Sequence, residues 1–208
     1  MQKILIGTNN KGKIREYEIL FKGIFRPIPL NYLGLHLDVN EDGSSYEENA
    51  LIKLKYLKDK SPFPVITDDS GLEVTSLNNE PGIFSARYSG KNSSDERNIN
   101  KLLGKMKSLM ASSDTIGIDG KVKIDRSARF VCSIAYFDSE NSDEIITSYG
   151  ECHGLIVDEG RGYNGFGYDP VFYIEELSKT FAELSINQKS LISHRSQAVS
   201  DLLRQLNI

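Results

Sequence analysis

The sequence predicts an α/β fold with a mixed sheet. Short apolar runs alternate along the chain with segments whose apolar residues recur at helical spacing. Residues 128–137 and 144–157 are both strand-like, and the polar turn DSENSD between them is typical of an antiparallel pair. Helices mixed with such a hairpin favour a sheet of mixed direction. The 208 residues can form one substantial core or two lobes, and we expect a single domain over residues 1–208.

The chain begins with a short buried strand over residues 3–7 (KILIG), which is followed by the polar turn TNNKGK. The helix predicted next has an apolar stripe formed by Ile14, Tyr17, Leu20 and Phe21. Pro27 and Pro29 break the pattern after this helix.

A second helix is predicted next, because Ser44 and Glu47 have the spacing of a capping box. Its inner face consists of Ala50, Leu51, Leu54 and Leu57. The dipeptide Ser61-Pro62 ends this helix. The segments VIT and LEVTSL are then predicted as two strands on either side of a DDSG turn.

In the second half, the segment PGIFSARYSGKNSSDERN is predicted as a loop. The helix after it has the clearest apolar stripe in the chain, formed by Ile99, Leu102, Leu103 and Met106. Residues 111–127 are polar and predict a long surface loop. After the hairpin, the glycine-rich loop RGYNGFGYDP precedes a short strand VFYI. The last helix carries Ala198, Val199, Leu202, Leu203 and Leu206.

Composition and charge argue against several classes of protein. The net charge is −4, whereas a general nucleic-acid-binding protein is usually basic, so we expect no nucleic-acid partner. No apolar run reaches the length of a membrane span, and MQKILIGTNN does not have the pattern of a signal peptide. Cys132 and Cys152 are too few for a disulfide framework and predict reduced thiols in a cytoplasmic protein. With three histidines, we expect no His-rich transition-metal site.

The turn GTNNKGK, residues 7–13, lies between a predicted strand and a predicted helix and is close to a P-loop. A P-loop has Ser or Thr after the lysine to bind magnesium, but this chain has Ile14. Lys11, Lys13 and Arg15 lie in the first turn of the helix, where the helix dipole disfavours cations unless an anion binds. This position favours phosphate. The alternative is a solvated basic face with an Asn cap.

Asp68 and Asp69 end an apolar run and precede Ser70 and Gly71. Neighbouring side chains of a strand point to opposite faces, so the two acids are not expected to have the same role. An acid at a strand end suits magnesium, which takes carboxylate and phosphate oxygens together. A turn in which an Asp caps backbone groups is the alternative.

Two further segments could contribute to the same site. In EDGSSYEENALIK, Glu41 could join a metal site, while Asn49 and Lys53 share one face of the predicted helix. A surface lysine is the alternative there. In RGYNGFGYDP, glycines allow a ligand to approach the backbone, and Phe166 or Tyr168 could stack on a purine. A structural hairpin loop is the alternative for this segment.

The segment KSLISHR places His194 and Arg195 near the start of the last helix, with Ser190 or Ser193 as a possible cap. The helix dipole again disfavours cations at this position, and an anionic ligand would explain them. Arginine suits phosphate because its donors form a fork. An exposed basic pair is the alternative.

Together these parts suit a nucleoside triphosphate site, with two phosphate-binding turns, an acid pair for magnesium and an aromatic loop for a base. No Ser-His-Asp or Cys-His arrangement can be read from the sequence. Metal-assisted attack of water on phosphorus, with a carboxylate to orient or deprotonate the water, therefore fits best. The main rival enzyme is a P-loop kinase or NTPase with Asp68 as its Walker B acid, and Ile14 counts against it.

These motifs together resemble the inosine/xanthosine triphosphate pyrophosphatase family, the house-cleaning enzymes for non-canonical purine nucleotides. The resemblance runs from TNNKGKIRE through EDGSSYEENALIK, TDDSGLEV and PGIFSARYSG to GFGYDPVF and KSLISHR. It implies hydrolysis of ITP, dITP and XTP to the monophosphate and pyrophosphate, with Mg²⁺. It also implies an elongated mixed sheet flanked by helices, two lobes with a cleft between them, and a homodimer. Gln188 and Ser190 stand where the family often has an acidic residue and Asn.

The resemblance also implies roles for individual residues. Asp69 would be the general base and would hold Mg²⁺ together with Glu41, while Asp68 would support the site by capping the turn or orienting a lysine. The substrate contacts that it implies are Thr8, Asn9, Asn10, Lys11, Gly12, Lys13, Lys53, Ser70, Phe166, Gly167, Tyr168, Asp169, Lys189, His194 and Arg195. Phe166 would stack on the base, and a donor to its 6-oxo group would favour hypoxanthine over adenine.

Two alternatives keep a nucleotide ligand but change the function. A related house-cleaning pyrophosphatase would act on pyrimidine or modified nucleotides. A non-catalytic nucleotide sensor would bind tightly without turnover, even with magnesium.

Overall fold

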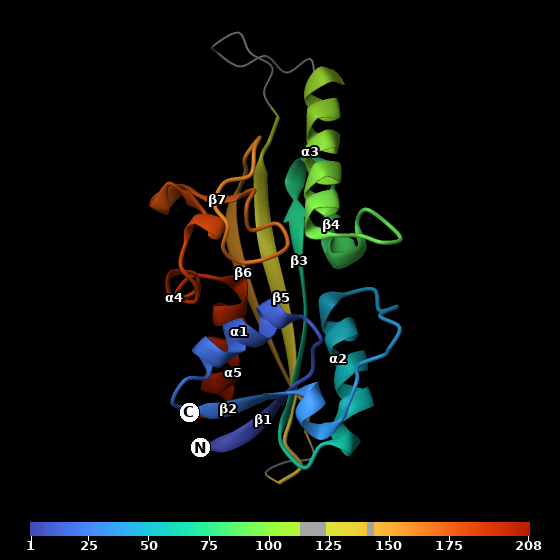
Figure 1. Cartoon of the computed structure of the whole chain (residues 1–208), viewed down its shortest axis with the longest axis vertical. Coiled ribbons are helices and arrows are strands. Elements are labelled where there is room, and N and C mark those ends of the chain that lie inside the picture. The colour runs from blue at the N-terminus through green and yellow to red at the C-terminus, as the bar shows by residue number, and fades with distance from the viewer. Residues whose placement is uncertain (113–123, 141–143) are drawn as a thin grey trace. The chain divides into compact units, whose positions relative to one another are not determined.

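The computed structural model describes residues 1–112, 124–140 and 144–208, and Figure 1 shows its ribbon. The α-helices are α1 (Lys11–Leu20), α2 (Tyr46–Leu57), α3 (Asp95–Ser112), α4 (Ile186–Lys189) and α5 (His194–Gln205). The strands are β1 (Gln2–Ile6), β2 (Phe25–Pro29), β3 (Val65–Val74), β4 (Glu80–Pro81), β5 (Ser127–Phe137), β6 (Ile146–Ile156), β7 (Phe172–Ile174) and β8 (Lys179–Thr180). Short 3-10 helices cover Leu30–Leu33, Lys58–Lys60, Thr75–Leu77, Gly82–Arg87, Glu175–Leu177 and Phe181–Glu183.

Most of the predicted surface loop over 111–127 lies outside the described residues. Ala111 and Ser112 belong to the end of α3, and Ser127 begins β5. Within the described residues, no helix is long and apolar enough to cross a bilayer. Cys132 and Cys152 are both buried, and neither takes part in a disulfide.

The chain divides into two compact units, which are described separately. Unit 1 comprises Met1–Ser70, Val131–Glu151 and Ile186–Ile208, and unit 2 comprises Gly71–Phe130 and Cys152–Ser185. The three longer strands β3, β5 and β6 each contribute residues to both units.

The strands form one mixed sheet in the order β2-β1-β3-β5-β6-β7-β8, with β4 paired to β3. In unit 1, β1 pairs in parallel with both β2 and β3. In unit 2, β4 pairs antiparallel with the end of β3, and β7 pairs antiparallel with β6 and β8. The N–H of Ile156, at the end of β6, donates to the Arg126 carbonyl before β5 at 2.9 Å, as in an antiparallel hairpin. The predicted α/β fold with a mixed sheet is therefore confirmed.

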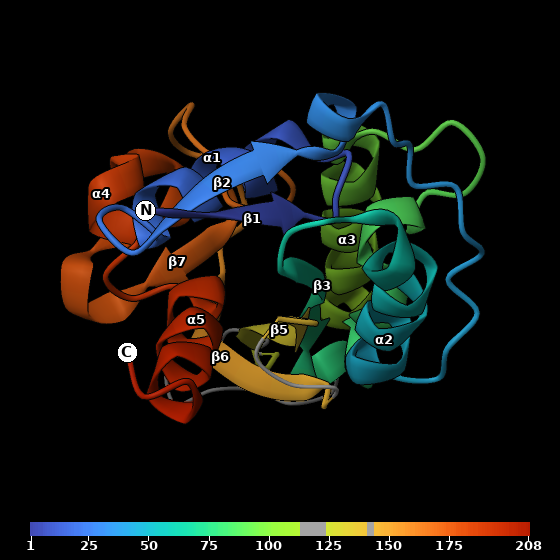
Figure 2. The ribbon, with the colours of Figure 1, turned by 90° about the horizontal axis from the view of Figure 1, so that it is seen from below.

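Side chains that alternate along the strands of unit 1 fill two cores, one on each face of the sheet. Ile4 and Ile6 of β1 point into one core, and Leu5 between them points into the other. Helices α1 and α5 cover the first core and α2 covers the second, as Figure 2 shows. This two-sided burial explains why the strands of unit 1 read as nearly continuous apolar runs.

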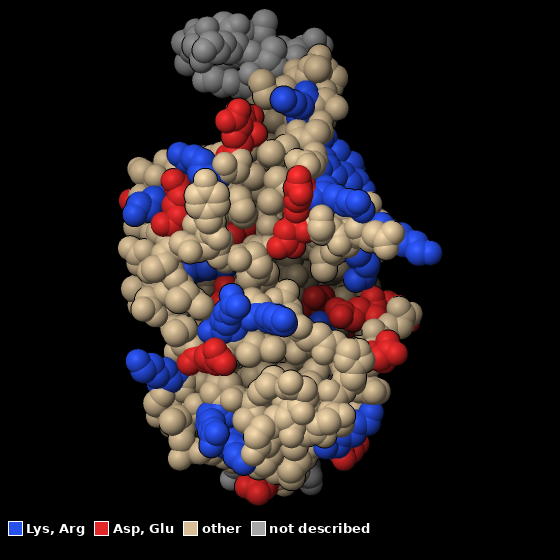
Figure 3. All heavy atoms as spheres, in the orientation of Figure 1, with Lys and Arg blue, Asp and Glu red and all other residues tan. Residues whose placement is uncertain are grey.

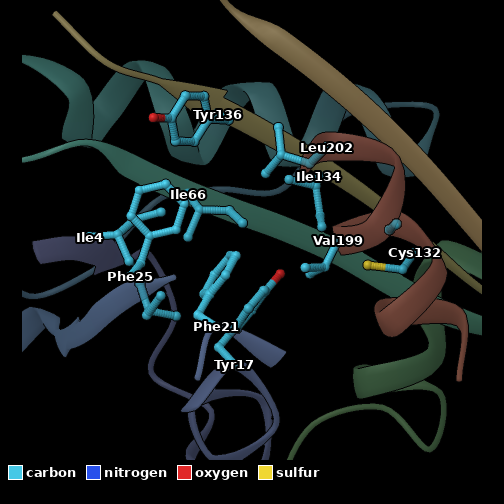
Figure 4. Packing of buried hydrophobic residues seen from close by; sticks show 12 residues of the cluster. Ile4, Tyr17, Phe21, Phe25, Ile66, Cys132, Ile134, Tyr136, Val199 and Leu202 are labelled. Atoms are coloured by element: carbon cyan, nitrogen blue, oxygen red, sulfur yellow. The ribbon is translucent and has the colours of Figure 1, made fainter. Parts of the chain in front are cut away.

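An aromatic cluster fills the core under α1 and α5 (Figure 4). The rings of Tyr17 and Phe21 stack with centroids 5.6 Å apart, and Phe21 meets Phe25 edge to face at 5.4 Å. Val199 and Leu202 of α5 complete this core. The apolar stripes that the sequence predicts for the helices α1 and α5 therefore face the interior, as expected.

In unit 2, three phenylalanine rings form an aromatic core. The ring of Phe130 in β5 lies 4.7 Å from that of Phe172 in β7 and 5.8 Å from that of Phe181. Phe172 and Phe181 are 4.9 Å apart, so each ring contacts the other two. Leu102 and Met106 from the predicted stripe of α3 are also buried.

The predicted turn at DDSG is wrong, because β3 continues without interruption from Val65 to Val74. Asp, Ser and Gly have low strand propensity, but pairing with neighbouring strands decides the conformation of a central strand. The strand β2 was also not predicted from the sequence; in it, Pro27 and Pro29 pair with Ile4 and Ile6 of β1. Since β2 ends the sheet order, its prolines lie in an edge strand, where a missing N–H is tolerated.

The predicted capping box of α2 is out of register by one residue. Ser45, rather than Ser44, caps the helix, and its hydroxyl accepts a hydrogen bond from the Glu48 N–H at 3.1 Å. The Glu48 carboxylate, rather than that of Glu47, accepts from the Ser44 N–H at 2.6 Å. Adjacent serines and adjacent glutamates allow both registers, so spacing alone could not decide between them.

Basic and acidic side chains are interspersed on the face of the molecule shown in Figure 3. Blue side chains adjoin one another at the upper right of this view, and red side chains adjoin one another at the right of its middle. Other charged side chains are buried, among them Glu16, Asp68 and Arg195.

Gly150 in β6 lies directly against the backbone of α5. A Cβ at this position would come within 2.3 Å of the His194 carbonyl oxygen and 2.4 Å of the Ala198 nitrogen. We expect Gly150→Ala to lower the free energy of unfolding by about 3 kcal/mol, the upper part of the range for overpacking. Gly104→Ala in α3 is the control, because a Cβ at this position meets nothing within 4 Å. This substitution should stabilise the helix by about 0.5–1 kcal/mol. Urea unfolding measures the free energy of unfolding of both variants. Equal changes in the two would contradict the close contact between Gly150 and α5.

Candidate functional site

Asp68 and Asp69 of β3 organise the candidate site of unit 1. Their side chains point to opposite faces of the strand, as the sequence predicted. Asp68 contacts Lys13 of α1 and Arg195 of α5. Asp69 contacts Asn49 and Lys53 of α2. One dipeptide therefore joins the helices of both faces of the sheet.

Asp68 is almost completely buried, with 1% of its side chain exposed. Its Oδ2 atom lies 2.9 Å from the Lys13 Nζ and accepts hydrogen bonds from Arg195 Nη2 at 2.9 Å and Nε at 3.3 Å. The Cys132 thiol lies 3.8 Å from the same oxygen. Arg195 also donates to the Ser70 hydroxyl at 3.0 Å, so it holds the residue that follows Asp69.

Glu16 of α1 is a second buried acid of this cluster, and sequence reasoning missed it. It pairs with Arg195 through Nη1, and its Oε1 lies 2.8 Å from the Lys189 Nζ. Glu16 follows Lys13 by three residues and therefore lies on the same face of α1. That spacing is a signal by which Glu16 could have been found.

Both acids of this cluster stay ionised although they are buried. Burial raises the pKa of each, but the charges of nearby cations outweigh it. Arg195 and then Lys189 bring the pKa of Glu16 below its ordinary value. Lys13 and then Arg195 hold the pKa of Asp68 far below its ordinary value.

Three cations face these two acids. Lys13 and Arg195 contact Asp68, while Lys189 and Arg195 contact Glu16. Among the three cations, Lys13 has the most exposed side chain, at 12%, compared with 5% for Lys189 and 0% for Arg195. Lys13 is therefore the cation of this cluster that lies nearest to solvent.

His194 and Arg195 form the first turn of α5 and are both buried, so they are not the exposed basic pair considered as the alternative. Ser193 caps this helix, because its hydroxyl accepts from the Ser196 N–H at 3.1 Å. Burial, followed by the charges of Arg195 and Lys189, lowers the pKa of His194 well below its ordinary value. His194 is therefore a neutral imidazole, which can either donate or accept a hydrogen bond.

On the other face of β3, two carboxylates lie around one ammonium group. The Lys53 Nζ lies 2.9 Å from Glu41 Oε2 and 3.7 Å from Asp69 Oδ1. Asp69 also accepts hydrogen bonds from Asn49 Nδ2 and the Ser70 N–H, both at 2.9 Å. Glu41 and Asp69, distant in sequence, therefore approach the same cation.

This pair of carboxylates fits a magnesium ion. Mg²⁺ is usually bound by one or two carboxylates and completes its ligands with water and substrate phosphates. The ammonium of Lys53 shows that a cation can lie within reach of both acids. In the described part of the chain, no three His, Cys, Asp or Glu side chains gather into a metal-binding group. Glu41 and Asp69 would thus supply only part of the ligands.

The turn before α1 has the Asn cap that was considered as an alternative to phosphate binding. The Asn10 side chain accepts from the N–H groups of Gly12 at 2.7 Å and Lys13 at 3.1 Å. Thr8 in turn accepts from the Asn10 N–H through its hydroxyl at 3.1 Å. The basic face is not fully solvated, because Lys13 pairs with Asp68.

Other residues of the same turn serve different purposes. The Asn9 amide donates to the Leu37 carbonyl at 3.0 Å, and Lys11 is exposed. Ile14 packs against the core under α1 and α5. An apolar side chain therefore packs against the core where a P-loop would carry a magnesium-binding hydroxyl.

The predicted loop residues Phe166, Gly167, Tyr168 and Asp169 belong to unit 2. Asp169 is buried, and its carboxylate accepts from the Phe166 N–H at 3.0 Å. Asp95 of α3 accepts from the Gly167 N–H at 2.7 Å. Tyr168 is buried and donates its hydroxyl hydrogen to the Ser85 carbonyl at 3.0 Å, whereas Phe166 is partly exposed. Phe166 is therefore the aromatic side chain of this loop that a ligand can reach more readily.

A pocket of about 310 Å³ in unit 2 lies between this loop and the start of α3. Its lining includes Phe166, Gly167, Asp95 and Ile99. Asp95 was missed by sequence reasoning, whereas Asp169 was predicted as a substrate contact; together their carboxylates fix the backbone at Phe166 and Gly167.

Comparison with known proteins gives consistent results across nearly the whole chain. A model of the Ham1 family matches residues 4–205. A dITP/XTP pyrophosphatase of Staphylococcus aureus strain MRSA252 is 42% identical over 200 residues, which cover 96% of this chain and 94% of the relative.

Two solved structures have the same fold. The Staphylococcus aureus Ham1 protein has a TM-score of 0.79 and 43% identity, and the match covers 99% of this chain and 98% of that one. A HAM1 protein from Coxiella burnetii has a TM-score of 0.80 and 38% identity, and the match covers 100% of this chain and 99% of that one.

The buried acids make stability depend on pH. In an unfolded chain, the pKa values of Asp and Glu are about 3.9 and about 4.3. In the folded protein, the pKa values of Asp68 and Glu16 lie below these values. Their contribution is fully present above the unfolded values and is lost as the pH falls through the folded values. We therefore expect the free energy of unfolding to decline as the pH is lowered below about 5. Denaturant titrations between pH 7 and pH 3 measure this decline.

The variant Asp68→Asn should lose about 3–5 kcal/mol at pH 7, because Arg195 keeps its charge without one of its partners. Its stability should also fall less steeply between pH 5 and pH 3 than that of the parent. Asp59→Asn is the control, since the side chain of Asp59 is 80% exposed. Equal acid slopes in the parent and in Asp68→Asn would contradict this account.

Proposed function

Because the chain belongs to the Ham1 family, we propose that it hydrolyses non-canonical purine nucleoside triphosphates, namely ITP, dITP and XTP. The products would be the nucleoside monophosphate and pyrophosphate. The observation that carries this proposal is the arrangement of charge at β3, with Lys13 and Arg195 against Asp68 on one face and the carboxylates of Glu41 and Asp69 beside Lys53 on the other. A triphosphate needs positively charged side chains, and the divalent cation that accompanies it needs carboxylates.

Lys13 is the residue that we expect to bind the triphosphate directly. It lies in the first turn of α1 and keeps part of its side chain exposed while it pairs with Asp68. Arg195 is fully enclosed, so we propose that it acts by holding Asp68 and Ser70. Lys53 has the charge to contact a phosphate oxygen next to Glu41 and Asp69.

Glu41 and Asp69 are the proposed ligands of Mg²⁺. When it is bound, Mg²⁺ would offset the negative charge of the phosphates. Asp69 would orient a water molecule and take its proton as the water oxygen attacks the phosphorus nearest the nucleoside. The bond from that phosphorus to the bridging oxygen would break, and pyrophosphate would leave with the bonding electrons. Hydrogen bonds from Asn49 and the Ser70 N–H fix the Asp69 carboxylate for this role.

Phe166 is the proposed stacking residue for the purine ring, since it is partly exposed beside a pocket. Tyr168 and Asp169 would contribute by holding the loop, because both are buried and bonded to protein groups. His194 is neutral and Lys189 is charged, so either can offer a hydrogen-bond donor to a 6-oxo group. A homodimer and a cytoplasmic location remain part of the proposal, on the family resemblance.

The substrate proposal is tested with a panel of ITP, dITP, XTP, GTP, dUTP and dTTP, with separate detection of pyrophosphate and orthophosphate. We expect pyrophosphate release with Mg²⁺, at kcat/KM values for ITP, dITP and XTP at least about tenfold above the others, since contacts to a 6-oxo group discriminate between bases. Orthophosphate or phosphotransfer would support a kinase or NTPase instead. Preference for dUTP or dTTP would support a pyrimidine pyrophosphatase, and tight binding without turnover would support a sensor.

Asp69→Asn removes the proposed base and a metal ligand while keeping the shape of the side chain. We expect kcat to fall at least about 100-fold, the lower end for general-base catalysis, with nucleotide affinity in the absence of metal nearly unchanged. Stopped assays and calorimetric titration with dITP measure the two quantities. Asp59→Asn, an exposed acid after α2, should retain the parent kcat. Near-normal turnover in Asp69→Asn would remove Asp69 from the mechanism, and loss of the circular dichroism signal would make it a structural residue.

A further inference from the structure

Asn49 of α2 is completely buried and makes hydrogen bonds to two different segments. Its Nδ2 donates to Asp69 Oδ2 at 2.9 Å, and its Oδ1 accepts from the Gly43 N–H at 2.9 Å. The Gly43 N–H can only donate, and the Asp69 carboxylate accepts. A side-chain amide satisfies both neighbours at once, and its orientation is fixed by them.

The segment held by Asn49 carries Glu41. Residues 35–43 have no regular secondary structure, so few backbone hydrogen bonds of helix or strand type fix this segment. Leu35 and Leu37 anchor its beginning by packing against the core under α2. Near its other end, Gly43 lies so close to α2 that a Cβ would come within 2.8 Å of both Asn49 Oδ1 and the Glu48 Cβ. Glu41 lies two residues before this point of contact.

We propose that Asn49 is a positioning residue that holds the segment carrying Glu41 against Asp69, so that both carboxylates reach one divalent cation. This inference rests on the proposed function, which assigns the cation to Glu41 and Asp69. One oxygen of Asp69 is bound by Asn49, and its other oxygen lies 3.7 Å from Lys53. Asn49, together with the Ser70 N–H that donates to the other oxygen, therefore fixes which oxygen of Asp69 faces the cation site. Groups that orient metal ligands in this way typically change metal affinity 10–100-fold when they are replaced.

Three substitutions separate the two contacts of Asn49. Asn49→Ala removes both hydrogen bonds. Asn49→Asp keeps an acceptor for the Gly43 N–H but loses the donor and places a second carboxylate beside Asp69. Gly43→Ala displaces the segment while the Asn49 amide can still reach Asp69.

Thr67→Val is a matched control. Thr67 lies in β3 two residues before Asp69, and its hydroxyl donates to the Ala50 carbonyl of α2 at 2.8 Å. This substitution therefore removes a buried hydrogen bond between the same helix and the same strand without touching either carboxylate. It measures the effect of losing such a bond alone.

The first measurement is hydrogen exchange of residues 39–44 in the nucleotide-free protein. We expect faster exchange in Asn49→Ala and Gly43→Ala, and nearly parental exchange in Asn49→Asp and Thr67→Val. Parental exchange in Asn49→Ala would overturn the inference that Asn49 holds this segment. The experiment needs neither metal nor substrate.

The second measurement is the Kd for Mn²⁺, determined by electron paramagnetic resonance without nucleotide. We expect an increase of about 10-fold or more for Asn49→Ala and Asn49→Asp, and of less than about twofold for Thr67→Val. Equal values for Asn49→Ala and Thr67→Val would overturn the inference, as would a parent that binds Mn²⁺ no better than Asp69→Asn. Both measurements are independent of turnover, so a parent that releases no pyrophosphate refutes the proposed function alone.

Discussion

The candidate site of unit 1 depends on the buried ion pair between Arg195 and Asp68. A guanidinium with no exposed surface is stable only when carboxylates and further hydrogen bonds replace its lost water. Asp68 comes from β3 and Glu16 from α1, so this requirement fixes the start of α5 against both elements. Removing Asp68 or Glu16 leaves the buried Arg195 without one of its counter-charges, and therefore these positions cannot vary independently. Ser70 is held by the same guanidinium, which extends the constraint to the residue beside Asp69.

The strand β3 separates structural and chemical roles within two neighbouring residues. Asp68 has 1% of its side chain exposed and is committed to cations of the protein. Asp69 has 11% exposed and is bound on the other face by an amide, a backbone N–H and the more distant ammonium of Lys53. Because the strand pleat sends adjacent side chains to opposite faces, the rigid ion-pair cluster can support Asp69 without competing with it for a ligand.

Local pattern predicted most of the helices and strands, and it failed where long-range pairing decides. The stripe of Tyr17 and Phe21 could be read from spacing, since a helix must bury one face. The strand through DDSG could not, because Asp, Ser and Gly favour turns and only their neighbours in the sheet hold them extended. Within the site, strand geometry separated Asp68 from Asp69. Glu16 escaped notice because its partner Arg195 is 179 residues away.

Arg195 also limits what cations at a helix start can reveal. The sequence suggested an anionic ligand near α5, yet the anions beside Arg195 are carboxylates of the protein itself. The helix dipole favours any negative charge and cannot distinguish a ligand from a buried side chain. What remains informative is that the two faces of β3 differ, with Lys13 and Arg195 against Asp68 on one face and the carboxylates of Glu41 and Asp69 beside Lys53 on the other. The proposed ligand, a phosphate chain with its divalent cation, carries both signs of charge and therefore suits this arrangement better than an anion alone.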